Sequence, residues 1–215
     1  MSSGPLKSHT KRAYYPIFLD VTEKPCLVLG GGNVAKRKVA MLLRFNARVT
    51  VVSPIVNDAI LKLAQDGRIE IHQRPYALQD LDRCALVFAC TDDNAVNGKV
   101  REEAAVRNIP VNVADCPQMC DFIVPSIIKR KDLTIAVSTS GELPLLSRKL
   151  REKIEEIITD DYLEYLAIIG KFRKRLMTSV SDTRKRSMIM AKIDEMDIRD
   201  VVTAGLSKIE NMFGL

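Results

Sequence analysis

Short apolar runs alternate with longer amphipathic stretches over the first half of the chain. In the amphipathic stretches apolar residues recur every three or four positions, as in 33–45, which predicts a helix with a wide buried face. The short runs are rich in β-formers, which is typical of strands covered on both sides. They lie at 26–29, 47–52, 69–72, 85–90 and 110–113. Strands and helices in alternation predict an α/β domain with a doubly wound parallel sheet.

Two more elements are expected around this sheet. A run at 14–21 predicts a short strand ahead of the first sheet strand. Ser53 and Pro54 are expected to end a strand and to start a helix, whose apolar stripe begins at Ile55 and reaches Ala64.

The pattern changes after Asp115. Strand-like runs at 122–128 and 133–137, separated by charged residues, predict a hairpin. Its apolar faces would be exposed unless another subunit covers them, so this segment is expected to mediate dimerisation. From Pro144 onward the pattern is helical. The expected parts are 1–115 for the cofactor domain, 116–145 for a small β-containing dimerisation segment, and 146–215 for a helical domain.

Charge adds a preference for anionic ligands. The 215 residues include 33 basic and 27 acidic side chains, for a net charge of +6 and an isoelectric point of about 9.1. This balance also permits nucleic acid, but aromatic residues make up only 5% of the chain and no base-stacking motif is present. A solvated basic surface is preferred, and no nucleic-acid partner is expected.

Hydropathy favours a protein without a membrane partner. No apolar run approaches the roughly 18 residues that a membrane-spanning helix needs. Residues 1–10 lack the apolar core of a signal peptide. A cytoplasmic protein is therefore expected.

The cysteines predict no metal site. Cys26, Cys84 and Cys90 fall inside apolar runs, where a small buried thiol is usual. Cys116 and Cys120 have neither a second cysteine pair nor a nearby histidine. Zinc ligands normally come as a set of four, so structural thiols are the preferred interpretation.

The residues after the first sheet strand carry the clearest candidate chemistry. Gly30, Gly31 and Gly32 stand between an apolar strand and a helix that starts at Asn33 and Val34. The first glycine permits a tight turn, and the third lets the backbone approach a pyrophosphate without an intervening Cβ atom. Free amides and the helix dipole then favour the anion. These five residues predict a Rossmann-like dinucleotide site.

A second candidate stretch follows the apolar run at 85–90. Thr91 and Asp92 stand at the carboxyl end of the predicted strand, where open α/β sheets place their ligand crevice. Such residues also cap helices, and the sequence leaves both roles open. His9 and His72 are the only histidines, so a histidine-based triad is poorly supported.

Several stretches between about residue 14 and residue 155 complete the picture, because they stand in one characteristic order and spacing. They lie at 15–20, 30–38, 91–93, 111–115, 122–126, 136–141 and 147–153. In this combination the chain resembles the precorrin-2 dehydrogenase and sirohydrochlorin ferrochelatase family, which acts in sirohaem biosynthesis. The combination is far more specific than the glycine motif alone.

The resemblance implies an NAD-dependent oxidation of precorrin-2 to sirohydrochlorin, and in many members insertion of ferrous iron at the same site. It also implies an intertwined homodimer and a cofactor lined by Ser53 and Pro54 besides the glycine turn. Ser53 stands where a general dinucleotide motif has an acidic residue for the ribose. The choice of NAD over NADP therefore does not follow from the residues alone.

Asp115 matches the family's aspartate implicated in both reactions, so it is the expected catalytic residue. Dehydrogenation releases a proton as well as a hydride, and metal insertion releases two pyrrole protons, so a carboxylate in the crevice can serve each step. The alternative is that Asp115 only turns the chain after the last strand of the sheet.

A polar loop beginning at Ser138 and Thr139 is expected to contact the carboxylates of the tetrapyrrole. The stretch 138–143 has one glycine fewer than the family's commoner pattern, which affects its expected shape. Arg148 is a further candidate, since a guanidinium binds carboxylates bidentately, although a solvated position is an equal alternative. A dimeric regulatory module that senses NAD without turnover is the remaining functional alternative.

Overall fold

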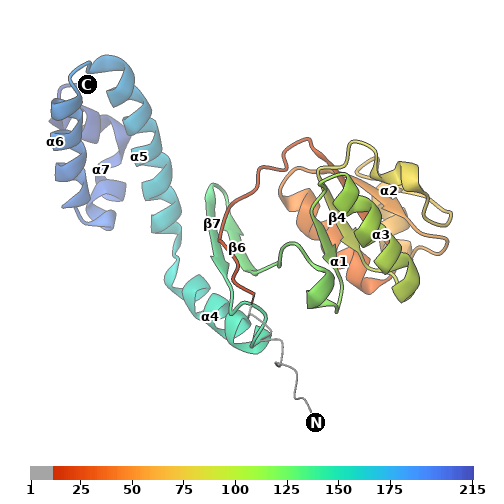
Figure 1. Ribbon diagram of the computed structural model, residues 1–215. Helices are drawn as coiled ribbons and strands as arrows, with labels where there is room; N and C mark the ends of the chain where they lie inside the picture. The colour runs from red at the N-terminus through yellow and green to blue at the C-terminus, as the bar shows by residue number, and fades with distance from the viewer. Residues whose placement is uncertain (1–11) are drawn as a thin grey trace, which may run out of the picture. The chain divides into compact units, whose positions relative to one another are not determined.

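The computed structural model describes residues 12–215, which form two compact units (Figure 1). The first unit extends to Val124 and the second begins at Pro125. Each unit has its own buried apolar residues.

The first unit is built on a five-stranded sheet in the order β3-β2-β1-β4-β5, with every neighbouring pair parallel. The predicted doubly wound α/β architecture is confirmed. The central strand β1 pairs with β2 on one side and with β4 on the other. The strands are β1 (Pro25–Leu29), β2 (Arg48–Val52), β3 (Glu70–His72), β4 (Leu86–Ala89) and β5 (Val111–Val113).

Helices cover both faces of this sheet, because alternate side chains of each strand point to opposite sides. On one face, Val28 and Phe88 pack with residues of α1 (Asn33–Arg44) and α2 (Asp58–Gln65). On the other face the apolar side chains of β1 and β4 pack against α3 (Asn94–Val106) and the short 3-10 helix η1 (Leu78–Leu81). Both faces are thus buried, as the continuous apolar runs predict.

The predicted strand at 14–21 is wrong. This segment pairs with no strand of the described chain and has no regular secondary structure. Tyr15 and Phe18 are 87% and 76% exposed. An apolar run becomes a strand only where a neighbouring edge accepts its hydrogen bonds, and here no described strand does so.

The helix expected after Pro54 begins later, at Asp58. Asn57 is its N-cap, with a side-chain oxygen that accepts a 3.0 Å hydrogen bond from the Ile60 amide. The expected start of the apolar stripe, Ile55, lies outside the helix and is 83% exposed. The intervening residues instead form a turn against the glycine stretch, since the Asn57 amide donates to the Gly31 carbonyl oxygen at 2.9 Å.

The first strand of the predicted hairpin is also shorter than expected. Residues 122–124 are not a strand but belong to the core of the first unit, where the Phe122 and Phe88 rings make an edge-on contact with centroids 5.5 Å apart. The hairpin itself consists of β6 (Ser126–Arg130) and β7 (Leu133–Val137), which are antiparallel.

In the second unit, α4 (Pro144–Ile157) packs on this hairpin, and three further helices form a cluster of their own (Figure 1). They are α5 (Asp160–Ser179), α6 (Thr183–Asp194) and α7 (Ile198–Met212). Phe172 and Ile209 are fully buried among them, and Gly205 breaks α7 with a positive φ of 71°. No helix between residues 12 and 215 is long and apolar enough to span a membrane.

Candidate functional site

Two of the three glycines are required by the protein's own backbone. Gly30 has a φ of +107°, and a Cβ atom there would lie 2.4 Å from the Cys90 carbonyl oxygen. A Cβ atom on Gly31 would lie 2.0 Å from the carbonyl oxygen of Ile55. The glycine turn is therefore wedged between the chain after β4 and the turn after β2, where any other residue would clash.

Gly32 differs, because a Cβ atom there would meet nothing within 4 Å. It is the N-cap of α1 and, having no side chain, leaves the first amides of the helix without a side-chain acceptor. By contrast, α2 is capped by Asn57 and α3 by Asp93. An open surface over an uncapped helix N-terminus fits a pyrophosphate group, with Asn33 and Val34 supplying the first helical amides.

Ser53 shapes the turn beside the glycines. Its side chain is buried, and its hydroxyl donates a 2.7 Å hydrogen bond to the Ile55 carbonyl oxygen, while its amide donates to His72. The hydroxyl oxygen keeps lone pairs that can accept another hydrogen bond. Pro54 is exposed next to it. Both residues stand at the carboxyl end of β2, on the same edge of the sheet as the glycine turn.

Thr91 and its neighbours form the entry to α3. The Thr91 hydroxyl donates to the Asn97 side-chain oxygen at 2.8 Å, and the Asn97 amide group returns a 2.9 Å bond to the Thr91 carbonyl oxygen. Asp93 caps the helix by accepting from the Ala95 and Val96 amides. Helix capping, one of the roles open for this stretch, thus falls to Asp93, while Asp92 is exposed at the carboxyl end of β4.

Asp115 lies just beyond β5, at the same edge of the sheet. Its backbone is in the left-handed region with a φ of 56°, and its side chain is exposed. The preceding residue, Ala114, donates a 2.8 Å hydrogen bond to the Ala89 carbonyl oxygen at the end of β4. Gly30 approaches the next residue of that strand end, Cys90. The glycine turn and the Asp115 turn therefore flank the end of one strand.

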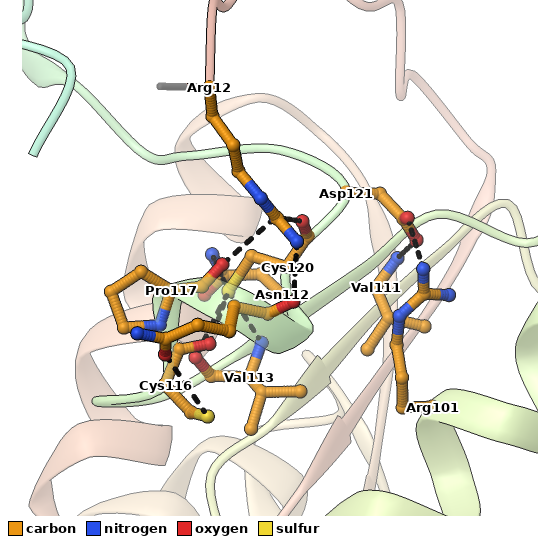
Figure 2. A network of polar contacts seen from close by, with 10 residues as sticks. Arg12, Arg101, Val111, Asn112, Val113, Cys116, Pro117, Cys120 and Asp121 are labelled. Atoms are coloured by element: carbon orange, nitrogen blue, oxygen red, sulfur yellow. Dashed lines mark hydrogen bonds and ion pairs between the residues drawn. The ribbon is translucent and has the colours of Figure 1, made fainter. Parts of the chain in front are cut away.

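The loop after Asp115 folds back on β5 (Figure 2). The Asp121 carboxylate accepts from the Val111 amide at 3.0 Å and from Arg101 at 2.7 Å, while the Asp121 amide donates to Val111. The buried Cys120 thiol lies 3.2 Å from both the amide nitrogen and the carbonyl oxygen of Val113. Burial raises the pKa of this thiol, so it stays protonated near neutral pH.

Arg12 clamps the same loop from a distant part of the chain. Its guanidinium donates to the carbonyl oxygens of Pro117 at 3.0 Å, Gln118 at 2.5 Å and Cys120 at 2.6 Å (Figure 2). These carbonyls belong to the short 3-10 helix η2 (Pro117–Met119) and its end. No sequence pattern signals this contact, because the partners are more than 100 positions apart and carbonyl oxygens are common to all residues.

Lys38 is a second residue that the sequence motifs do not single out. Its ammonium lies 5.1 Å from the centroid of the buried Phe88 ring, within the range of a cation–π contact. Its neighbours Lys36 and Arg37 are exposed, whereas Lys38 is half-buried. The helical pattern contains this information, since Lys38 is three residues after the buried Ala35 and so borders the buried face.

The predicted substrate residues belong to the second unit. Thr139 and Ser147 hydroxyl oxygens lie 3.1 Å apart, and Thr139 also accepts from the Leu143 amide. Ser138 accepts from the Ser140 amide at 3.0 Å. Arg148 is exposed and pairs with Glu152 one turn along α4, at 2.9 Å. The structure thus brings Ser138 and Thr139 together in a polar loop at the start of α4.

Metal-binding geometry is not present in the described part of the chain: between residues 12 and 215 no group of three His, Cys, Asp or Glu side chains is placed to hold an ion. A shallow cavity of about 460 Å³ lies at the opposite edge of the sheet, before β4 and β5. It is lined in part by Arg83 and Arg107, which precede the amino ends of β4 and β5. The glycine turn follows the carboxyl end of β1 and so lies at the other end of the strands.

Comparison with known proteins agrees with this geometry. Residues 17–126 match the family described as putative NAD(P)-binding, and residues 130–157 match the family described as sirohaem biosynthesis protein central. The siroheme synthase of Methylobacillus flagellatus is 41% identical over 190 residues, which cover 88% of this chain and 41% of that protein. The siroheme synthase of Pseudoalteromonas atlantica is 39% identical over 200 residues, or 93% of this chain and 43% of that protein.

The chain spans about two fifths of the length of these relatives. A solved structure named SirC, precorrin-2 dehydrogenase, has the same fold, with a TM-score of 0.77, 23% identity, and coverage of 94% of this chain and 99% of that one. The resemblance to sirohaem-forming proteins that the sequence motifs predict is confirmed. The chain belongs to the putative NAD(P)-binding family, whose match spans the sheet, the glycine turn and Asp115.

Proposed function

We propose that this chain catalyses the NAD-dependent oxidation of precorrin-2 to sirohydrochlorin. The observation that carries the proposal is the placement of the glycine turn and Asp115 on either side of the carboxyl end of β4. A dinucleotide held at Gly32 and a substrate beside Asp115 would meet at that edge. The siroheme synthase relatives and the likeness to SirC, precorrin-2 dehydrogenase, support the choice of substrate.

The reaction converts precorrin-2 and NAD⁺ into sirohydrochlorin, NADH and a proton. When bound, the cofactor supplies a nicotinamide ring that accepts the hydride. The amides at the start of α1 hold the pyrophosphate, and the open surface at Gly32 admits it. The Asp115 carboxylate accepts the proton that leaves the tetrapyrrole, since its turn presents it to solvent at the site.

NAD is the proposed cofactor rather than NADP. A 2′-phosphate requires a nearby cationic side chain, usually arginine. The turn 53–57, which follows β2 where the ribose is held in this fold, contains no basic residue. Ser53 has a hydroxyl oxygen that can still accept a hydrogen bond from a ribose hydroxyl. Thr91 and Asp92 remain proposed contacts at the end of β4.

A second activity, insertion of Fe²⁺ into sirohydrochlorin, is proposed for the same site. Metal insertion displaces two pyrrole protons, and Asp115 is the carboxylate available at this edge to accept them. The iron is a substrate here, and the macrocycle nitrogens are its ligands. The siroheme synthase relatives support this proposal, because their name describes formation of the metallated product.

A homodimer is proposed to complete the site, with 1–115, 116–145 and 146–215 as the cofactor, dimerisation and helical parts. Leu145 and Leu146 of α4 are 57% and 41% exposed beside the β6–β7 hairpin, as expected of a surface that a second copy covers. The polar loop at Ser138 and Thr139, with Arg148, is proposed to bind carboxylates of the tetrapyrrole.

Anaerobic incubation with precorrin-2 and NAD⁺ tests the main proposal. Formation of NADH and sirohydrochlorin in equal amounts is expected, and Asp115→Ala should abolish it while NAD⁺ affinity changes less than about twofold. Asp66→Ala, at an exposed aspartate that ends α2 away from the carboxyl ends of the strands, is the matched control and should retain turnover. NAD⁺ binding without oxidation of the tetrapyrrole by the unaltered chain would instead indicate the regulatory module that the sequence leaves open.

A further inference from the structure

Lys38 carries a poorly compensated charge near the candidate site. Its side chain is half-buried against the Phe88 ring, which also makes an edge-on contact with the Phe122 ring. Between residues 12 and 215 no carboxylate lies within ion-pair distance of its ammonium. A ring face compensates only part of the hydration that a buried cation loses. Burial accordingly lowers the pKa of Lys38 below its ordinary value.

The groups around this ammonium are those of the candidate site. The Phe88 ring next to this ammonium belongs to β4, one residue before its carboxyl end, and Phe88 pairs with Asn112 of β5. Asp115 stands two residues beyond β5, and its carboxylate attracts the proton-bound form of Lys38. The Lys38 ammonium therefore lies towards the carboxyl edge of the sheet, where Asp115 also stands.

The cofactor does not explain this charge. Lys38 is five residues beyond Asn33, which is about 7.5 Å along the helix axis from the amides that receive the pyrophosphate. The part of NAD that would lie near Asp115 is the nicotinamide, whose carboxamide is uncharged. An anion that reaches Lys38 must then come from the second substrate.

We propose that Lys38 binds a carboxylate of the tetrapyrrole beside Asp115 and so holds the macrocycle over the nicotinamide. This inference rests on the proposed function. The substrate is a polycarboxylate, and Asp115 alone would repel it, so a cation next to Asp115 allows an anionic ring to approach an anionic base. Lysine suits the position because its ammonium is a compact charge on a stem that packs against an aromatic ring.

Lys38→Met is the informative variant, because methionine keeps an unbranched apolar stem against Phe88 but carries no charge. Lys36→Met is its matched control, since Lys36 is exposed on the same helix. Binding of sirohydrochlorin, followed by its absorbance in an anaerobic titration, should weaken at least tenfold in Lys38→Met and stay unchanged in Lys36→Met. NAD⁺ affinity should change less than twofold in both. Lys38→Arg, which restores a cation, should recover most of the binding.

The thermal midpoint provides an independent readout. Loss of a poorly paired buried charge should leave the midpoint of Lys38→Met equal to or above that of the unaltered chain, which a purely structural role would not produce. If Lys38→Met does not fold, Lys38→Gln is measured in its place. Tetrapyrrole binding equal to that of Lys36→Met would overturn the role of Lys38 while leaving the proposed oxidation intact. Failure of the unaltered chain to bind or oxidise the tetrapyrrole would overturn both.

Discussion

The guanidinium of Arg12 donates a 2.6 Å hydrogen bond to the carbonyl oxygen of Cys120, which is 108 positions further along the chain. Two carbonyl oxygens of the short helix η2, which Cys120 follows, also accept from this one side chain. Since Asp115 stands only two residues before that helix, Arg12 ties the chain amino-terminal to the sheet to the turn that carries the proposed base.

Loss of this clamp should affect catalysis more than folding. Arg12→Ala is expected to lower kcat about tenfold, with the KM for NAD⁺ unchanged, because the Asp115 turn loses its outer support. The free energy of unfolding should fall by about 1 to 2 kcal/mol, as for loss of partly exposed hydrogen bonds from a charged donor. Steady-state kinetics and urea unfolding measure the two effects.

Arg48→Ala provides the control for Arg12, since the Arg48 guanidinium also donates to a distant carbonyl, that of Glu23, at 2.8 Å. Its kcat should match that of the unaltered chain. If Arg12 acts only through Asp115, then Arg12→Ala should have no further effect on turnover in an Asp115→Ala background. A further loss there would contradict the positioning role.

The glycines of the turn should separate folding from cofactor binding. Gly30→Ala should destabilise the protein by about 2 to 4 kcal/mol, because of its positive φ and its contact with Cys90. Gly32→Ala should lower stability by only about 0.5 to 1 kcal/mol, the usual preference at an N-cap, yet weaken NAD⁺ binding at least tenfold. Thermal unfolding and calorimetric titration test this pair. Unchanged NAD⁺ affinity in Gly32→Ala would place the pyrophosphate elsewhere.

Buried thiols should make the protein sensitive to alkali. Burial raises the pKa of Cys26, Cys84 and Cys90 from 9.0 to about 11. The folded chain therefore holds thiol protons that the unfolded chain releases, so their stabilisation is complete below pH 9 and is lost as the pH rises through about 11. For Cys26, which is 2% exposed, a rise of about two pKa units corresponds to a loss of about 3 kcal/mol.

Urea unfolding at pH 8 and at pH 10.5 measures this dependence. Cys26→Ala should be less stable than the unaltered chain at pH 8, through loss of packing, but should lose less stability between the two pH values. Equal losses in both proteins would show that other groups control the alkaline limb.

The proposed dimer should depend on the exposed apolar side chains of α4. Leu145→Glu is expected to shift sedimentation from dimer towards monomer, because burying a carboxylate in an apolar interface costs more than it returns. Met188→Glu is the control, since Met188 is 65% exposed on α6. A chain that sediments as a monomer before any substitution would remove the dimer from the proposal.

Periodicity was sufficient to predict the sheet and most helices, because both faces of the sheet are buried and every apolar run there has one interpretation. It failed at 14–21 and at Ile55, where apolar side chains are exposed and local pattern carries no information about partners. A run of such residues predicts burial, but another copy of the chain can provide the burial as readily as a strand.

The candidate site likewise contains residues that local sequence order predicts and residues that depend on long-range contacts. The glycine turn, Ser53 and Asp115 follow from order along the sequence, because the carboxyl ends of parallel strands meet at one edge. Arg12 depends on a contact that spans the whole domain, so no local pattern indicates it. The partial burial of Lys38 is predictable from the sequence, since its position in the helix places it beside the buried Ala35.

The loop from 116 to 122 has a consequence beyond catalysis. An edge strand normally presents a row of unpaired backbone groups on which another chain can add a strand, and such edges promote aggregation. Here Asp121 and the Cys120 thiol occupy the Val111 and Val113 backbone groups along the outer side of β5. The loop that follows Asp115 therefore also protects the sheet against edge-to-edge polymerisation, and variants that loosen this loop are expected to lose solubility together with activity.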